Sequence, residues 1–397
     1  MHTRIGKFSI SLVVFTSLFF YGLHITLRSI LLRQISEDFG VGYTESGIIF
    51  LVGLLSVIAA TLIVGKLAKH IGMRTVFTIS ILGAALMLFT QAMSGLYIIF
   101  ITAAFLITGF TTGQNISGNS LVAAAFAGDG GAKLNLMHVF YGLGSCFAAL
   151  ACFLAGMESG PGWRGLFTML AFLLVLVLAW LPFYRFRPPE GARRPENVEF
   201  SGALRDPLFQ KVALAGIFAT GLENCISCWL VYVLEDGAGT TVDFAVLLLA
   251  LFFGCLALGR ACGSMLARRN KLEGLLLPIA ILQAGLCILA IVYMQVHPWL
   301  FALAGLCCSI YFPTYYYKVA HLCKAAGAGA VFILVTHFGI AFFPFMVGVF
   351  GDLLTIRWGL VIVPFCAILL IPAHCLIKRE ERRHVGLKDA CILPRER

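Results

Sequence analysis

The chain has 397 residues, of which 60% are hydrophobic and only 12% are charged, and its mean hydropathy is +0.94. A soluble domain is about a quarter charged, so this composition excludes a soluble enzyme with one buried core. The net charge of +10 does not indicate nucleic-acid binding, because the basic residues form short clusters between long apolar runs. The sequence therefore predicts an all-α membrane protein that crosses the bilayer many times.

Apolar windows of about 20 residues, the length needed to cross a bilayer, predict twelve transmembrane helices. They cover roughly residues 8–32, 44–65, 75–93, 97–121, 134–156, 164–184, 210–234, 242–264, 274–294, 298–317, 326–350 and 356–377.

The longest polar stretch, from Arg185 to Pro207, is rich in arginine and proline and has six predicted spans on each side. We therefore expect an N-terminal six-helix bundle over residues 1–186 and a linker over 187–208. A C-terminal six-helix bundle over 209–378 and a tail over 379–397 follow.

Basic residues orient the chain. The loops that share a side with the linker carry nearly all of the lysines and arginines, whereas the opposite loops carry only Arg33, Arg164 and Arg357 together with many acids. Loops rich in Lys and Arg stay in the cytoplasm. Both termini and the linker are therefore expected to be cytoplasmic, with a bacterial inner membrane favoured by the short loops.

Thirteen cysteines lie mostly within apolar stretches, where a free cysteine behaves as a small hydrophobe. Cys225 and Cys228 form a C-x-x-C pair, but no second pair completes four ligands. No metal site is predicted.

The two halves show a short internal repeat. The sequence YGLH at residues 21–24 falls opposite TGLE at residues 220–223. A parallel repeat of two six-helix bundles is typical of one large class of transporters. On this alignment His24 and Glu223 occupy equivalent depths.

Several motifs carry a resemblance to the major facilitator superfamily. GKLAKHIGMR at residues 65–74 resembles the family's loop between the second and third spans, with Lys69 in place of the usual acid. LNLMHVFYGLG at 134–144, GLE at 221–223 followed by Trp229, and IYFPT at 310–314 are similar to the branch that contains fucose and glucose permeases.

The resemblance implies two pseudo-symmetric bundles that work by alternating access. It also implies a structural or gating role for Gly65, Gly72 and Arg74, where the glycines would allow tight packing and turning, and for His138 at the start of the fifth span. The fucose-permease pattern places acids in spans 1 and 4, where this chain has Ser29 and Asn115. The proton site of that branch therefore does not carry over.

Glu223 is the acid placed well inside a predicted span. Ionisable side chains are costly in lipid and usually face a cavity, so Glu223 is the predicted proton-coupling residue. The alternative is a permanent ion pair that holds the two halves together.

Polar residues in other spans form the predicted substrate site. His24 and Arg28 lie four residues apart on one helix face, with Tyr21 a turn below. Arg28 could bind an anion, pair with Glu223 or reach the membrane interface. The amides of the fourth span are natural partners for hydroxyl groups. The full predicted set is Tyr21, His24, Arg28, Gln114, Asn115, Asn119, Trp229, Tyr311 and His337.

These features predict a secondary active transporter, most simply a proton-coupled carrier of a small polar solute such as a sugar, with its site between the halves. An organic anion carrier that uses Arg28 and His24, a proton-driven exporter of amphipathic compounds and a non-transporting sensor stay open as alternatives. The chain lacks the G-x-x-x-x-G-K-[ST] loop of an ATP-driven pump. We expect no enzymatic activity, no cofactor, no nucleic-acid partner and a monomer.

Overall fold

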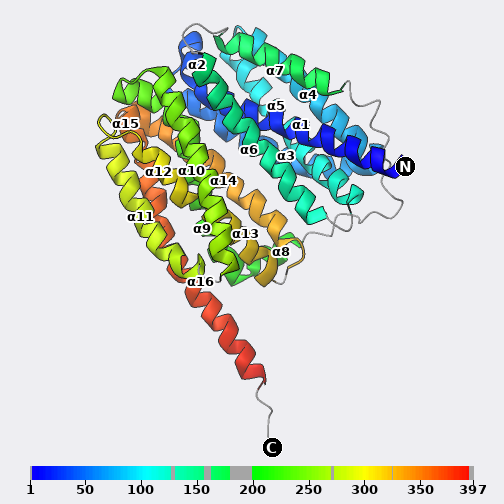
Figure 1. The fold of residues 1–397 in the computed structure, drawn as a ribbon, viewed down its shortest axis with the longest axis vertical. Helices are drawn as coiled ribbons and strands as arrows, with labels where there is room; N and C mark the ends of the chain where they lie inside the picture. The colour runs from blue at the N-terminus through cyan, green and yellow to red at the C-terminus, as the bar shows by residue number, and fades with distance from the viewer. Residues whose placement is uncertain are drawn as a thin grey trace, which may run out of the picture. The chain divides into compact units, whose positions relative to one another are not determined.

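The computed structural model describes residues 2–126, 130–155, 162–178, 199–269, 272–323 and 325–392. Across these ranges the regular elements are helices, with no strand (Figure 1). The predicted all-α fold is confirmed.

The first half of the chain folds into seven helices, six of which match predicted spans. They are α1 (His2–Ile30), α2 (Leu32–Phe39), α3 (Tyr43–Ile71), α4 (Met73–Met93), α5 (Tyr97–Ala125), α6 (Gly130–Ala155) and α7 (Gly162–Leu178). The short α2 continues the direction of the chain beyond the first predicted span.

The second half supplies the remaining helices. They are α8 (Phe200–Arg205), α9 (Pro207–Ala238), α10 (Val242–Arg268), α11 (Leu272–Val292), α12 (Leu300–Cys308), α13 (Tyr311–Leu322), α14 (Ala328–Leu353), α15 (Ile356–Gly359) and α16 (Ile362–Ile392).

Within the described ranges, nine helices are long and apolar enough to cross a membrane, and Val139–Leu154 and Gly162–Leu178 are shorter apolar helices. The predicted span 298–317 is divided between α12 and α13. The break falls at Ser309 and Ile310 because Pro313 has no N–H to donate to the carbonyl of Ser309.

The chain forms two compact units. Unit 1 comprises Met1–Arg194, Ser227–Phe253 and Pro344–Gly359, and unit 2 comprises Pro195–Ile226, Gly254–Phe343 and Leu360–Arg397. Unit 1 therefore contains one end of each of α9, α10 and α14 in addition to the first seven helices. Residues 187–198 of the predicted linker lie outside the described residues, and 199–208 carry α8 and the start of α9. The predicted domain boundaries stay a prediction.

Helices of unit 1 approach closely through glycine. A Cβ at Gly22 of α1 would overlap the carbonyl of Tyr141 in α6, and a Cβ at Gly144 would overlap the carbonyl of Phe19. Glycines of α5 act in the same way, since a Cβ at Gly109 would lie 2.9 Å from Ser56 Oγ of α3. The helices pack at distances that side chains would prevent.

Unit 2 repeats this arrangement between α9 and α14. A Cβ at Gly221 would overlap the ring of Phe343, and one at Gly339 would overlap the carbonyl of Ile217. Gly221 is the residue that the internal repeat aligns with Gly22. Both aligned glycines therefore lie where a neighbouring helix comes close, although Gly22 meets a backbone carbonyl and Gly221 meets a ring.

The two glycines predicted to shape the loop between α3 and α4 differ in their surroundings. Gly72 has φ +80°, in the left-handed region that favours glycine. A Cβ at Gly65, in contrast, would meet no atom within 4 Å. The structure thus shows open space beside Gly65, and its structural role stays a prediction.

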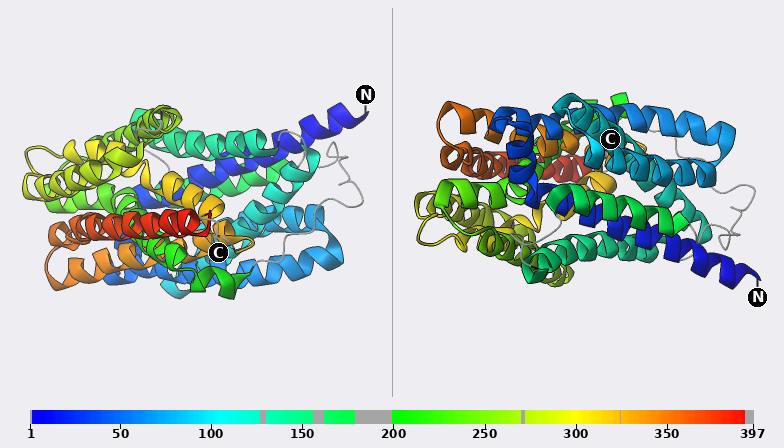
Figure 2. Two further views of the ribbon diagram at one scale, coloured as in Figure 1. Left: turned by 90° about the horizontal axis from the view of Figure 1, so that it is seen from below. Right: turned by 90° about the horizontal axis from the view of Figure 1, so that it is seen from above.

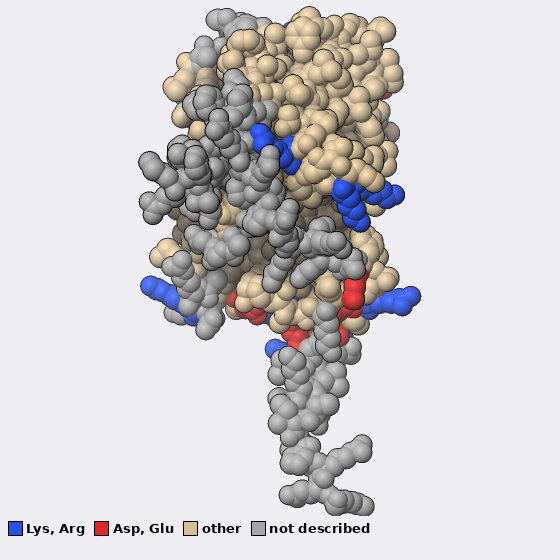
Figure 3. Space-filling view, turned by 90° about the vertical axis from the view of Figure 1, so that its right-hand side faces the viewer, with Lys and Arg blue, Asp and Glu red and all other residues tan. Residues whose placement is uncertain are grey.

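The surface is that of a protein surrounded by lipid. Large apolar side chains are widely exposed, among them Leu62 at 67%, Ile98 at 69% and Leu154 at 73%. In Figure 3 the described atoms over the upper part of the face are almost all neither acidic nor basic, and charged atoms form small patches across the middle and near the lower edge. Such surfaces are stable only where hydrocarbon, and not water, covers them.

Candidate functional site

The predicted site residues divide between the two units. Unit 1 holds those of α1 and α5 together with Trp229, and unit 2 holds Glu223, Tyr311 and His337. Figure 2 shows the helices of both units from two further sides. Each group is described within its own unit.

Arg28 lies in the last turn of α1 and has no carboxylate partner in the described part of the chain. Its Nε is buried and makes no hydrogen bond there. The guanidinium carbon lies 5.1 Å from the ring centroid of Phe50 in α3, as a cation–π contact. The ring offsets only part of the cost of burying this charge.

His24 and Thr26 add further unpartnered groups to α1. Their side chains are 5% and 1% exposed, and neither the two ring nitrogens of His24 nor the hydroxyl of Thr26 has a hydrogen-bond partner in the described residues. The His24 ring packs edge-on against Phe167 of α7, with centroids 5.9 Å apart. Buried polar groups without partners are rare in proteins.

The amides of α5 lie on a helix that packs against α1. Gln114 is 2% exposed, and its Nε2 donor has no partner within the described ranges. Asn115 and Asn119 are half-buried. Tyr21 of α1 packs against Tyr141, with ring centroids 5.5 Å apart.

Trp229 is engaged in packing. It is fully buried, and its indole N–H donates to the carbonyl of Pro344 at 2.8 Å. Its ring stacks on Tyr232 at 5.8 Å and lies 6.2 Å from Phe50. In this conformation the polar group of Trp229 is already used.

In unit 2, Glu223 forms an ion pair that the sequence interpretation missed. Its Oε1 accepts a hydrogen bond from Nη2 of Arg260 in α10 at 3.2 Å. The Glu223 and Arg260 side chains are 21% and 45% exposed. The alternative prediction for Glu223 was an ion pair that holds the two halves together. Both Glu223 and Arg260 belong to the C-terminal half, so this pair does not join the halves.

The other two predicted residues of unit 2 differ in burial. Tyr311 is 1% exposed and stacks on Tyr315 at 6.1 Å, and neither hydroxyl has a partner among the described residues. His337 is half-buried, and its Nδ1 lies 2.7 Å from the carbonyl of Ile333 in the same helix.

Unit 2 also contains a buried cation, Lys318, that was not predicted. Lys318 of α13 is 3% exposed and binds Glu273 of α11 at 2.6 Å and Glu381 of α16 at 2.5 Å. Lys211 of α9 pairs with Glu380 beside it. Lys318 follows directly on a predicted span, but its partners come from two other helices, α11 and α16, and the sequence does not fix which sides of these helices face it.

The end of unit 1 at which α1 finishes, here the distal end, carries a charged network. Arg33 of α2 contacts Glu37 at 2.9 Å and Glu235 of α9 at 3.1 Å. Burial by itself would lower the pKa of Arg33, but the carboxylates of Glu235 and Glu37 outweigh it and raise that pKa above its ordinary value. Arg33 therefore stays charged.

The same end holds a helix cap. Asp352 of α14 accepts hydrogen bonds from the backbone N–H groups of Tyr43 at 3.1 Å and Thr44 at 2.8 Å. These are the first residues of α3, where free N–H groups and the helix dipole favour a carboxylate. The Tyr43 hydroxyl also donates to Asp236 of α9.

The predicted gating residues give less information. Gly65 and Gly72 flank the end of α3, and Arg74 lies half-buried in the first turn of α4. His138 belongs to α6, but its side chain lies outside the described residues.

Comparisons with known proteins agree on one fold. The family model described as Major Facilitator Superfamily matches residues 11–344. No curated protein sequence matches the chain.

Solved structures share the architecture at low sequence identity. A bacterial homologue of the human lysosomal transporter Spinster, inward-facing and unoccupied, is 13% identical, with a TM-score of 0.79 over 94% of this chain and 97% of that one. The nucleoside transporter NupG is 13% identical, with a TM-score of 0.76 over 94% and 99%. The E. coli fucose:proton symporter FucP is 18% identical, with a TM-score of 0.62 over 92% and 98%.

Proposed function

The chain belongs to the major facilitator superfamily and is a membrane transporter, not an enzyme, and we propose that it carries a small organic anion by alternating access. The sequence interpretation placed a neutral sugar first and an anion second. The charges of unit 1 support the reverse order.

The proposal rests on the lack of a carboxylate partner for Arg28 among the described residues. Lys211, Arg260 and Lys318, three cations in helices of the C-terminal half that the structure describes, each contact a carboxylate. Arg28 has none in the described part of the chain. An unpaired buried charge is destabilising by several kcal/mol, so a mobile anion that completes the pair would bind with a strong electrostatic advantage.

The neighbouring groups suit an acceptor-rich ligand. Arg28 Nε and Gln114 Nε2 are buried donors without partners in the described residues. A carboxylate or phosphate offers only acceptors. His24 and Tyr21, which lie on the same helix, complete the proposed contact set.

Proton coupling is proposed for Glu223. Protonation of this carboxylate would release Arg260, which changes the charge within unit 2 by breaking one ion pair. A secondary transporter can use such a step to link solute movement to the proton gradient. We further propose cytoplasmic termini and a bacterial inner membrane, which the distribution of basic residues and the short loops support.

A proton-coupled sugar carrier is the second candidate. Asn115 and Asn119 are half-buried on α5, where amides would bind hydroxyl groups. The structural neighbours include a fucose:proton symporter and a D-xylose-proton symporter, although their low identity establishes only the fold.

The test is thermal unfolding of the purified transporter against neutral sugars, carboxylates and phosphate esters at pH 5.5 and 7.5. A ligand raises Tm only if it binds the folded form more tightly than the unfolded form. Stabilisation by carboxylates or phosphate esters is expected in the wild type and in Arg28→Lys, and its loss is expected in Arg28→Gln. Stabilisation by neutral sugars that survives in Arg28→Gln and disappears in Asn115→Ala would establish the second candidate instead.

A further inference from the structure

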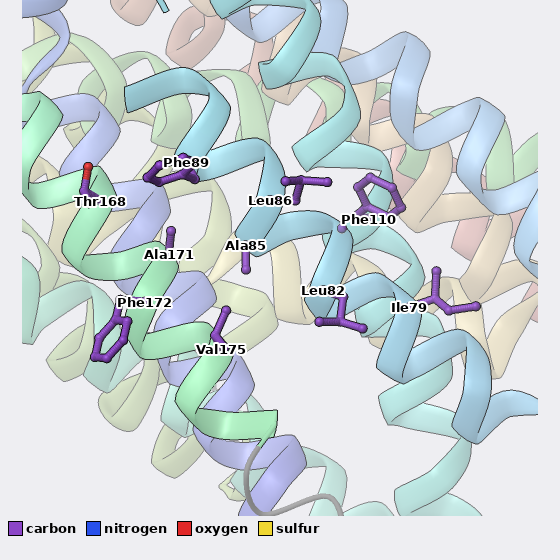
Figure 4. Close-up of a pocket in the computed structure, with 11 residues that line it drawn as sticks. Ile79, Leu82, Ala85, Leu86, Phe89, Phe110, Thr168, Ala171, Phe172 and Val175 are labelled. Atoms are coloured by element: carbon purple, nitrogen blue, oxygen red, sulfur yellow. The ribbon is translucent and has the colours of Figure 1, made fainter. Parts of the chain in front are cut away.

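An apolar groove lies on unit 1 between α4 and α7 (Figure 4). Its volume is about 630 Å³. Leu82, Leu86 and Phe89 of α4 face Phe172 and Val175 of α7 across it.

Small residues create the hollow. Ala85 and Ala171 line the groove and are only 3% and 5% exposed, so they form its floor. Gly83 also lines it, and the space next to its Cα is taken by the ring of Phe110. Larger side chains at the two alanines would fill the groove.

The groove has too few polar groups to hold ordered water. Thr168 is the one polar residue among those that line it, and its hydroxyl already donates to the carbonyl of Arg164 at 2.8 Å. Water needs two to four polar partners to occupy a cavity. The rim residues Leu86 and Phe172 are 60% and 63% exposed on helices of the membrane-embedded bundle, so hydrocarbon is the available filler.

Arg164 marks one end of the groove. It lies four residues before Thr168, which together with Phe89 stands at that end in Figure 4. Its Nη1 donates to the carbonyls of Ala92 at 2.9 Å and Ser94 at 2.7 Å, at the end of α4.

The Arg164 cation is held in place but stays accessible. Its Nε lies 3.6 Å from Asp38, and the side chain is 40% exposed. The guanidinium carbon also lies 4.3 Å from the ring centroid of Trp163 and 5.7 Å from that of Phe39. A fixed, accessible guanidinium at the end of an apolar channel matches the two parts of one molecule, an anionic phosphate joined to an acyl chain.

We propose that a membrane phospholipid binds unit 1 at this groove, with one acyl chain between α4 and α7 and its phosphate at Arg164. The lipid is a resident of the N-terminal bundle and not the transported solute. Lipid binding at this groove is therefore independent of the proposed anion transport.

The test is native mass spectrometry of the full chain released from membranes, with Val175→Trp and Val139→Trp as a matched pair. Both valines are about equally exposed, at 48% and 52%, but Val139 lies on α6 outside the groove. The wild type and Val139→Trp are expected to retain a stoichiometric phospholipid. Val175→Trp is expected to retain about tenfold less, as if roughly two methylene groups lost their contact.

A second arm tests the phosphate contact. Arg164→Lys keeps the cation and should keep the lipid, whereas Arg164→Gln should lose it. Equal retention by the wild type and Val175→Trp would overturn the proposal. So would equal loss in both tryptophan variants, or detergent in place of phospholipid on the wild-type protein.

Discussion

Charged side chains within unit 2 pair with side chains of opposite charge in the same unit. Glu223 pairs with Arg260, and Lys318 pairs with two glutamates, all within unit 2. Each pair removes the cost that a lone charge would impose in a low-dielectric setting. Arg28 differs from these residues because it has no carboxylate partner in the described part of the chain, and this difference favours the binding of an anionic ligand.

The Glu223 pair gives a prediction about coupling. Glu223→Gln cannot release or take up a proton, so the dependence of solute uptake on the proton gradient should disappear, while counterflow exchange of labelled solute continues. The loss of stability should stay below about 1 kcal/mol, because Arg260 is nearly half exposed and remains hydrated. Uptake and counterflow in proteoliposomes measure the first effect, and thermal unfolding measures the second.

The double variant Glu223→Gln/Arg260→Gln is the control. It removes the unpaired arginine and should recover the stability that the single variant loses. If uptake by Glu223→Gln still follows the proton gradient, Glu223 is not the coupling residue.

At the scale of helices, glycine contacts decide how closely the spans pack, and two glycines of α6 separate this effect from helix propensity. A Cβ at Gly144 would overlap the backbone of Phe19, whereas a Cβ at Gly142 would meet nothing within 4 Å. Gly142→Ala should therefore stabilise the protein by up to about 1 kcal/mol. Gly144→Ala should lower Tm, because α1 and α6 must separate to admit the methyl group.

Thermal unfolding of the two alanine variants, side by side, measures this difference. Similar shifts in Tm for both variants would show that the α1–α6 contact tolerates a methyl group and that the glycine pair is not what sets it.

Sequence could predict these helices well because length and hydropathy alone define a span. It could also place Gly22 opposite Gly221, and both glycines lie close to a neighbouring helix. It could not tell that Gly65 faces open space, since the direction of a helix face depends on neighbours far along the chain. The break before Tyr311 was readable from Pro313 but was hidden by the continuous hydropathy of residues 298–317.

The candidate site was predictable in part. His24 and Arg28 were found from their spacing within an apolar run, and the structure shows a buried His24 and a half-buried Arg28 whose Nε is buried. Arg260 was missed as the partner of Glu223 because pairing across helices depends on rotation about each axis. The internal repeat carried no information on this point, because the pair lies within one half.

At the scale of the whole molecule, unit 1 draws on segments far apart in the chain. Ser227–Phe253 and Pro344–Gly359 belong to it along with the first half. We expect residues 1–190 and 191–397, expressed as separate polypeptides in one cell, to copurify through a tag on the first. Expressed alone, the first fragment should be degraded or aggregate, because it exposes the surface that those segments cover.

Copurification measured after detergent extraction decides this point. A first fragment that purifies alone as a stable, monodisperse species would show that the N-terminal half is complete without the later segments.

The cap at Asp352 has a consequence for timing. Its two hydrogen bonds to the start of α3 can form only while α14 and α3 are in contact. A motion that separates these helices leaves two backbone N–H groups and a carboxylate that must then be hydrated by water. The contacts are lost at the beginning of such a motion and regained at its end. Asp352 would therefore act on the lifetime of the contact between α3 and α14, and its removal would shorten that lifetime without changing which solute the transporter selects.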